Sequence, residues 1–317
     1  MHIALLHTSG TSRFADWAED ALARRGHDVR RAPSVDAAEA AIVGRDLGTA
    51  LQDRHPDAYL AAGWEAGVAA HLAARTAPGP VALRLTRPVR RPGSNEDRIE
   101  GALLRSSTRV LVVSAGERDR LVNRGVPRDT LRVLPDAVDT QLFTDRGPVA
   151  RGDTDDGRHR VGVAAPPDGA SRQVLLAGID SMPACHAVPV PPPEEWTDTT
   201  PALVRSLDLL VVVDDTDAEV ATALAAMASG VPVVASDAGV LADVVADGVT
   251  GLLVGRGGTA PAIRALLADP LGREGMGLAA IDRVRARFGQ DVVAGALAHQ
   301  LAALVPDVAP DEHAAAS

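Results

Sequence analysis

The chain has 317 residues, which is more than one average domain holds and suits two. Its formal net charge of −10 argues against non-specific binding to nucleic acid and to an anionic membrane surface. Every basic residue is an arginine, so lysine-dependent chemistry is excluded. Only 2% of the residues are aromatic, so the cores must be built from alanine, valine and leucine.

The single cysteine, Cys185, cannot form an internal disulfide, which favours a reducing compartment. No apolar run reaches the length of about 18 residues that is needed to cross a bilayer. The first ten residues lack a basic leader and fit a first strand better than a signal peptide. We therefore expect a soluble, cytoplasmic protein without a membrane span.

Apolar strands and amphipathic helices alternate through the first half of the chain. Strands are expected at IALLH, HDVRRAP, AYLAA, PVALRL, RVLVVS and TLRVLP, and helices at 15–25, 35–51, 67–75, 96–106 and 117–124. This alternation predicts an α/β fold, in which a parallel sheet carries helices on both faces.

A segment rich in turn formers and poor in apolar residues follows, and it predicts a linker. Beyond it, strands are expected at RVGVAA, VLLAGI, HAVPV, LDLLVVV, PVVAS and TGLLV, and helices at 260–268, 274–287 and 290–305. We expect a first domain over 1–145, a linker over 146–159, a second domain over 160–280, C-terminal helices over 281–305 that pack back toward the first domain, and a disordered tail over 306–317.

The most informative stretch runs from Ala221 to Val254. A helix of good helix formers ends at Gly230, and the buried strand PVVAS leads into a turn that contains Gly239. In an open α/β sheet, ligands bind at such a turn, because backbone N–H groups and the positive end of a helix point into the crevice there.

Five segments of the sequence resemble one known family. ALAAMASGVPVVASDAGVLADVVADGVTGLLV resembles the donor-binding segment of retaining glycosyltransferases of the GT-B fold, family four (glycosyl transferases group 1). LGREGMGLAAIDRVRARFG resembles the helix that follows in that family. VLVVSAGERDRLVNRGVPRDTLRVLPDAVDTQLF resembles the end of the family's acceptor domain, and HIALLH with RRGHDV resembles its start.

The resemblance implies two Rossmann-like domains with a facing cleft and C-terminal helices, the first on the acceptor side and the second, shortened, on the donor side. It also implies transfer of a sugar, with retention, from a nucleotide sugar to a small-molecule or glycan acceptor. No metal or other cofactor is expected, because cationic side chains and backbone N–H groups hold the diphosphate in such enzymes.

The family binds the donor with two glutamates that stand eight residues apart. In this chain the first position is Asp217, with Glu219 nearby as a possible substitute, and the second is Ala225. An alanine cannot accept a hydrogen bond from the ribose, and losing such a carboxylate costs about 1.5–3 kcal/mol of donor binding.

The family also places an arginine and a lysine near the first strand and helix of its second domain. Here the region reads RVGVAAPPDGASRQVLLAG, which we interpret as too short for a strand, a helix and the next strand. Arg160 and Arg172 are the cations nearby. Arg172 is the candidate for contact with the phosphates, although an arginine before a strand is commonly only solvated.

The acceptor side departs from the family as well. Its glycine pair after the first strand is reduced to Gly10, and the positions of its histidines hold Leu60 and Ala62 after one strand and Thr86 and Arg87 after another. His7 ends the first strand, where it is either a catalytic or a packed residue. In the donor turn the glycine pair is Gly239 and Val240, and Asp243 replaces a glutamate.

These positions give the candidate site. The candidate catalytic residues are Asp217 and His7, and the candidate donor-binding residues are Gly10, Arg172, Asp217, Glu219, Gly239 and Asp243. The aspartates 214, 215 and 217 form an acidic cluster that fits a cation or a hydroxyl-rich ligand, or a solvated loop. No CxxC, HExxH, GxGxxG or Walker motif is present, so no metal site is expected.

Two alternatives stay open beside the glycosyltransferase interpretation. The combined loss of the second carboxylate, the cationic pair and the acceptor-side histidine fits a catalytically inactive relative that serves as a binding or partner subunit. A weaker alternative is a different two-domain enzyme of similar fold, such as an epimerase.

Overall fold

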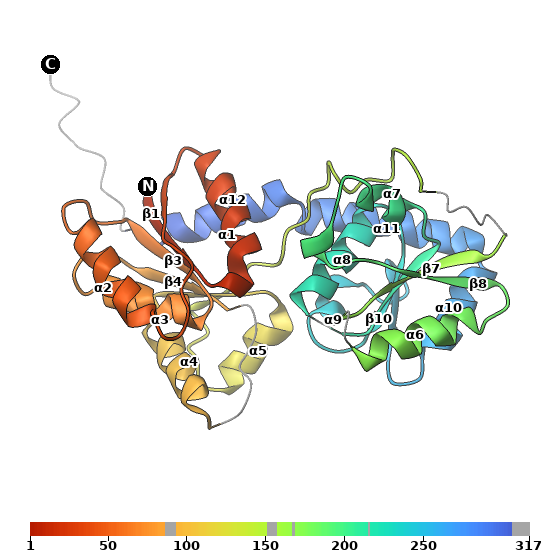
Figure 1. The fold of residues 1–317 in the computed structure, drawn as a ribbon, viewed down its shortest axis with the longest axis horizontal. Coiled ribbons are helices and arrows are strands. Elements are labelled where there is room, and N and C mark those ends of the chain that lie inside the picture. The colour runs from red at the N-terminus through yellow and green to blue at the C-terminus, as the bar shows by residue number, and fades with distance from the viewer. Residues whose placement is uncertain (86–92, 151–156, 167–168, 215, 306–317) are drawn as a thin grey trace, which may run out of the picture. The chain divides into compact units, whose positions relative to one another are not determined.

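The computed structural model describes residues 1–85, 93–150, 157–166, 169–214 and 216–305 (Figure 1). The chain forms two compact units. The first comprises Met1–Val112, Leu121–Val133 and the residues from Ala294 onward, and the second comprises Val113–Arg120 and Leu134–Val293. Residues 151–156 of the predicted linker and the predicted tail at 306–317 lie outside the described residues.

The first unit is built on a parallel sheet of six strands in the order β2-β1-β3-β4-β5-β6. Its strands are β1 (His2–His7), β2 (Asp28–Arg31), β3 (Ala58–Ala62), β4 (Val81–Arg84), β5 (Arg109–Val112) and β6 (Leu131–Val133). The connecting helices are η1 (Ser9–Thr11), α1 (Ser12–Ala23), α2 (Ala40–Leu51), α3 (Trp64–Ala73), α4 (Asn95–Ser106) and α5 (Ala115–Asn123), the first part of which counts with the second unit. The predicted α/β alternation is confirmed.

The second unit is built on a parallel sheet of five strands in the order β11-β10-β9-β7-β8. Its strands are β7 (His159–Ala164), β8 (Cys185–Pro189), β9 (Leu209–Val212), β10 (Val233–Ser236) and β11 (Gly251–Val254). Its helices are η2 (Pro193–Glu195), α6 (Ala170–Asp180), α7 (Thr200–Arg205), α8 (Asp217–Ala228), α9 (Leu241–Val244), α10 (Thr259–Ala268) and α11 (Pro270–Arg287). The last helix, α12 (Gln290–Ala302), crosses the boundary at Val293 and ends in the first unit.

One segment folds differently from its prediction. RVGVAAPPDGASRQVLLAG holds both β7 and most of α6, and the next strand begins only at Cys185. VLLAGI, which we expected as a strand, is the middle of α6, where the Val174 side chain is exposed and Ile179 is buried. A short apolar run does not separate a strand from a helix by periodicity alone. The segment itself therefore holds a strand and most of a helix, and the next strand, β8, follows beyond it. The inference that this region is compressed was wrong, because VLLAGI belongs to the helix and not to the next strand.

The start of α2 also moves relative to its prediction. The helix was expected from residue 35, but it begins at Ala40. The Asp36 carboxylate accepts a hydrogen bond from the Glu39 N–H group (2.8 Å), which closes a turn before the helix. An aspartate that bonds to the backbone in this way favours a turn over a helix interior.

The cores are made of small and branched aliphatic side chains, as the low aromatic content predicts. Helices α2 and α3 approach so closely that a Cβ built on Gly44 would lie 2.6 Å from the Ala69 carbonyl oxygen. Each unit also holds an aromatic pair. The rings of Phe14 and Trp17 in the first unit lie with centroids 5.7 Å apart, and those of Phe143 and Trp196 in the second meet edge to face with centroids 4.7 Å apart.

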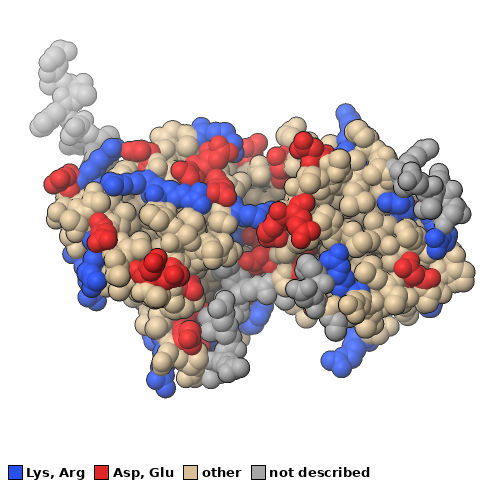
Figure 2. All heavy atoms as spheres, in the orientation of Figure 1, with Lys and Arg blue, Asp and Glu red and all other residues tan. Residues whose placement is uncertain are grey.

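Acidic and basic side chains are mixed on the face of the molecule that Figure 2 shows. Some acidic and basic side chains of the protein form surface ion pairs, such as Arg124 with Asp97 (2.6 Å). Exposed pairs of this kind contribute little to stability. No helix within the described ranges is long and apolar enough to cross a membrane.

Each sheet has one point at which its strand order reverses. In the first sheet it lies between β1 and β3, and in the second between β7 and β9. The chain leaves the carboxyl ends of these neighbouring strands in opposite directions, which opens a crevice where ligands bind in α/β folds. The residues at these two points are therefore the first candidates for function.

Candidate functional site

The reversal point of the second sheet is bordered by the N-terminus of α6. The Ser171 hydroxyl donates a hydrogen bond to the Asp214 carboxylate, which follows β9 (3.2 Å). Arg172 lies half-buried in the same turn, and its Nη1 donates to the Ala165 carbonyl just after β7 (3.3 Å). Arg172 therefore lies in the first turn of a helix at the carboxyl end of β7, which corrects the expectation that it precedes a strand.

The N-terminus of α8 carries two of the predicted carboxylates. Thr216 caps the helix, because its Oγ1 accepts a hydrogen bond from the Glu219 N–H group (3.4 Å). Asp217 is exposed, whereas only 4% of Glu219 is exposed. Both negative charges lie near the positive end of the α8 dipole, which stabilises the helix. Of the two, Asp217 is the one that solvent and ligands reach.

Ala225 lies in the interior of α8. It is completely buried in the core of the second unit, as are the neighbouring residues Leu224 and Ala226. Its side chain has no polar atom and offers no hydrogen-bond acceptor. The space that a carboxylate occupies in the resembled family is therefore part of the hydrophobic core in this chain.

The turn between β10 and α9 depends on Gly239. Its φ of 68° lies in the left-handed region, which glycine adopts without steric cost. Val240 follows in the right-handed helical conformation, and its half-buried side chain packs against the core. Because the Val240 side chain packs against the core, the backbone of the turn forms the surface at this point of the sheet's carboxyl edge.

Asp243 and the end of α9 are held by two partners within the second unit. The Asp243 carboxylate accepts a hydrogen bond from the Gly116 N–H group (3.0 Å). Arg283 on α11 donates from Nη2 to the Asp243 carbonyl and from Nε to the Val244 carbonyl, both at 2.7 Å. Burial, followed by the charge of Arg287, lowers the pKa of Arg283. Arg283 therefore caps the short helix that follows the Gly239 turn.

In the first unit, His7 lies at the carboxyl end of β1. Only 5% of it is exposed, and its Nδ1 lies 3.0 Å from the Thr8 carbonyl oxygen. Because a carbonyl only accepts hydrogen bonds, Nδ1 carries the hydrogen in this contact, and Nε2 is an acceptor in the neutral ring. Gly10 is exposed in η1, just beyond this strand end.

The loop that carries Gly10 is tied to the end of β3. Thr11 Oγ1 accepts a hydrogen bond from the Thr8 N–H group (2.8 Å) and lies 3.0 Å from the Ala62 carbonyl, to which it donates. These contacts join the loop after β1 to the neighbouring strand. The backbone around His7 and Gly10 is therefore fixed by buried side-chain hydrogen bonds.

The predicted site residues fall into two sets. At the carboxyl edge of the second sheet lie Arg172, Asp217, Glu219, Gly239 and Asp243, and at the same edge of the first sheet lie His7 and Gly10. Asp215, Thr86 and Arg87 lie outside the described residues. The structure adds Ser171 and Arg283 to the second set. A serine beside Arg172 was visible in the sequence, but nothing in the sequence links Arg283 to α9, which lies about 40 residues away.

No group of three or more His, Cys, Asp or Glu side chains within the described part of the chain is placed to hold a metal ion. The cations and N–H groups at the second sheet edge suit an anion. The expectation that no metal takes part stays a prediction.

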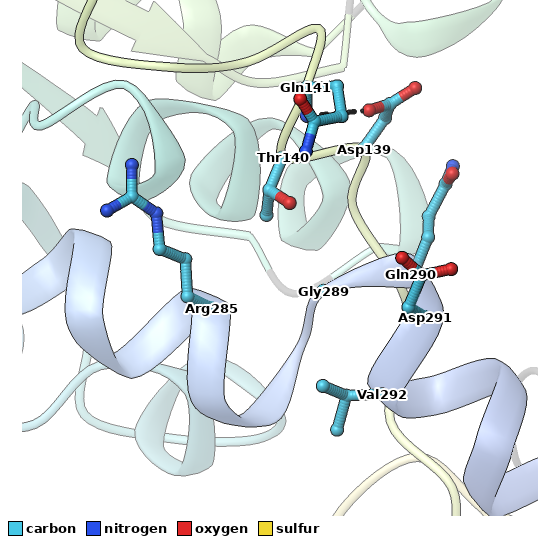
Figure 3. Close-up of a pocket in the computed structure, with 8 residues that line it drawn as sticks. All are labelled: Asp139, Thr140, Gln141, Arg285, Gly289, Gln290, Asp291 and Val292. Carbon is cyan, nitrogen blue, oxygen red and sulfur yellow. Dashed lines mark hydrogen bonds between the residues drawn. The ribbon is translucent and has the colours of Figure 1, made fainter.

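A separate hollow of about 180 Å³ lies elsewhere in the second unit. It is lined by Asp139, Thr140, Gln141, Arg285, Gly289, Gln290, Asp291 and Val292 (Figure 3). The Asp139 carboxylate closes a turn by accepting from the Gln141 N–H group (2.8 Å), and Val138 bonds through its backbone to Phe288 and Gln290. None of the predicted site residues lines this hollow, which belongs to the junction between α11 and α12.

Two family models match the chain. The model of the glycosyl transferase 4-like domain matches residues 6–137, and the model of the glycosyl transferases group 1 matches residues 188–269. The first match covers the end of β1 and the strands β2 to β6, and the second covers the end of β8 and the strands β9, β10 and β11. No protein among the curated sequences matches the chain.

Solved structures that resemble the chain include HepE of Anabaena in complex with UDP-glucose, at 16% identity and a TM-score of 0.71, covering 96% of this chain and 100% of that one. Sucrose-phosphate synthase of Thermosynechococcus elongatus matches at 18% identity and a TM-score of 0.70, covering 96% and 99%. A glycosyltransferase of Rickettsia africae matches at 11% identity and a TM-score of 0.75, also covering 96% and 99%. The chain has the GT-B fold of these proteins and, by the family models that match its two halves, belongs to the group 1 glycosyltransferases.

Proposed function

We propose that this protein transfers a sugar from a nucleotide-sugar donor to a hydroxyl group of an acceptor, with retention of configuration at the sugar. The observation that carries the proposal is the position of Arg172. It lies in the first turn of α6 at the reversal point of the second sheet, and the adjacent Ser171 bonds to Asp214, which precedes α8 in the chain. A cation and helix N–H groups at such a point suit a diphosphate.

Each residue of the edge has a role in this proposal. Arg172 and the backbone N–H groups of α6 and of the Gly239 turn stabilise the negative charge that grows on the diphosphate as the glycosidic bond breaks. Asp217 accepts hydrogen bonds from hydroxyl groups of the donor, and Ser171 and Arg283 hold the surrounding loops. His7 contributes its ring nitrogen Nε2 on the acceptor side.

Two further observations support a nucleotide-sugar donor and a cytoplasmic location. HepE of Anabaena, which shares the fold, has been solved with UDP-glucose and with UDP and glucose. The single cysteine leaves the chain without an internal disulfide, as is usual in a reducing compartment. A nucleoside diphosphate and its sugars are therefore the ligands to test first.

Isothermal titration with UDP, ADP, GDP and their glucose conjugates tests the proposal. We expect one nucleotide to bind, and Arg172→Ala to weaken it about 10- to 100-fold, because a hydrogen bond to a charged group is lost. Arg264→Ala is the matched control, since Arg264 is an exposed arginine on α10 whose charge acts on Cys185 at the opposite, amino end of the sheet. Failure of every nucleotide to bind the wild-type chain would contradict the donor site.

The burial of Ala225 favours a second candidate, a relative that binds without catalysis. Incubation with the bound nucleotide sugar, followed by NMR of the products, separates the two. Release of free sugar or transfer to an added sugar supports the enzyme, and the anomeric coupling constant of the product reports retention. Nucleotide binding without release or transfer would favour a binding subunit.

A further inference from the structure

Two arginines share one face of the first sheet near its edge, on the strands β5 and β6. Leu111 of β5 pairs with Arg132 of β6, and Arg109 lies two residues before Leu111. Facing residues of a parallel pair, and alternate residues of one strand, point to the same side of a sheet. Arg109 and Arg132 therefore lie on one face of the sheet, away from the carboxyl edge that carries His7 and Gly10.

Both guanidinium groups are held in place, but by neutral acceptors. Arg109 Nη1 donates a hydrogen bond to Gln300 Oε1 on α12 (2.9 Å). Arg132 Nη1 donates to the carbonyl groups of Asp129 and Leu131, both at 2.8 Å. These contacts keep both side chains at the amino end of the strands, and all of these residues belong to the first unit.

The two positive charges have no negative partner within the described ranges. Neither Arg109 nor Arg132 forms an ion pair with a carboxylate there. Burial, followed by the charge of Arg132, lowers the pKa of Arg109. The Nε atom of Arg109 is buried and has no hydrogen-bond partner among the described residues. Neighbouring like charges and buried donors without partners are costly unless an anion compensates them.

We propose that Arg109 and Arg132 bind the phosphate group of a small molecule at the amino edge of the first sheet. This inference goes beyond the proposed function and does not depend on it. The Nη2 groups of both arginines make no hydrogen bond with a described residue, and both side chains are partly exposed to solvent. A phosphate group carries about two negative charges and accepts several hydrogen bonds, so a single group compensates both cations.

Isothermal titration with inorganic phosphate tests the inference, with the ionic strength held constant by sodium chloride. We expect phosphate to bind the wild-type chain, and Arg109→Gln and Arg132→Gln each to weaken it about 10- to 100-fold, because a charged hydrogen-bond donor is lost. Glucose 6-phosphate in a second titration separates a site for free phosphate from one for phosphate esters, and binding of either supports the inference.

Two further variants serve as controls. Arg45→Gln is the matched control, because Arg45 is an exposed arginine on α2, which connects β2 to β3 toward the other end of the sheet. Arg172→Ala alters the proposed donor site in the second unit. Both are expected to bind phosphate as the wild type does.

Gln300→Glu is a second test, which adds a negative charge instead of removing a positive one. It places a carboxylate where Arg109 now meets a neutral amide, so we expect the variant to lose phosphate binding and to unfold at a higher temperature. Thermal denaturation checks that every variant folds. Failure of both phosphate and glucose 6-phosphate to bind the wild type overturns the inference. Unchanged affinity in Arg132→Gln or Gln300→Glu overturns it as well, as does loss of phosphate binding in Arg172→Ala.

Discussion

Single residues decide how much of a donor site this chain retains. The family places a carboxylate where Ala225 lies. In this chain Ala225 is completely buried among apolar residues, so the position lacks both the carboxylate and contact with solvent. Neighbouring aliphatic side chains fill that part of α8. In the proposed donor site, the ribose is therefore held through Asp217 and not through the second position.

Restoring the glutamate tests this view. We expect Ala225→Glu to lower the free energy of unfolding by about 2–5 kcal/mol, because a larger, polar side chain enters a packed core. Urea denaturation measures the change. Ala177→Glu, on an exposed position of α6, is the control and is expected to stay within about 0.5 kcal/mol of the wild type. A stable Ala225→Glu variant that binds UDP more tightly would show that the position still opens to the ligand.

At the scale of helices and strands, the sequence predicted the elements that depend on local residue patterns, such as buried strands and glycine turns. The central parallel strands are buried on both faces and therefore appear as apolar runs, whereas the edge strand β2 is exposed and polar. The Gly239 turn follows from the need for a left-handed backbone. The prediction for α6 was wrong because a short apolar run fits a strand and a helix equally well. The sequence gives no sign that the apolar side chain of Val174 is exposed in the structure. The Arg283 contact was beyond prediction, since it joins residues far apart in sequence.

Helix α9 has only four residues, so its end depends on Arg283. We expect Arg283→Ala to lower the free energy of unfolding by about 1–3 kcal/mol and to raise the apparent KM for the donor more than it lowers kcat, because two hydrogen bonds that position the turn are lost. Arg283→Lys recovers part of both, since lysine keeps the charge without the planar fork. Denaturation and steady-state kinetics measure the effects.

The control for this prediction lies on the same helix. Arg285 is exposed and forms a surface ion pair with Asp145 (3.7 Å), so Arg285→Ala is expected to change the stability by less than about 1 kcal/mol. Equal effects of the Arg283 and Arg285 substitutions would contradict a capping role for Arg283.

At the scale of the whole molecule, the chain consists of two units with separate cores. The proposed donor-binding residues Arg172, Asp217 and Gly239 lie in the second unit, so we expect UDP to protect that unit alone. At a concentration 100 times its Kd, UDP is expected to stabilise the second unit by about 2.7 kcal/mol. Calorimetry measures the shift, and hydrogen exchange locates it at the N-termini of α6 and α8 and the Gly239 turn. Protection confined to the first unit would refute this assignment.

The return of α12 to the first unit imposes an order on folding during synthesis. Leu297 and Leu301 of this helix are fully buried, and Gln300 accepts a hydrogen bond from Arg109 at the start of β5 (2.9 Å). A ribosome releases the strands of the first unit well before it releases these residues. The first unit is therefore synthesised first but completed last. Until α12 leaves the ribosome, the first unit lacks the part of this helix that packs against it, while the second unit is already being synthesised.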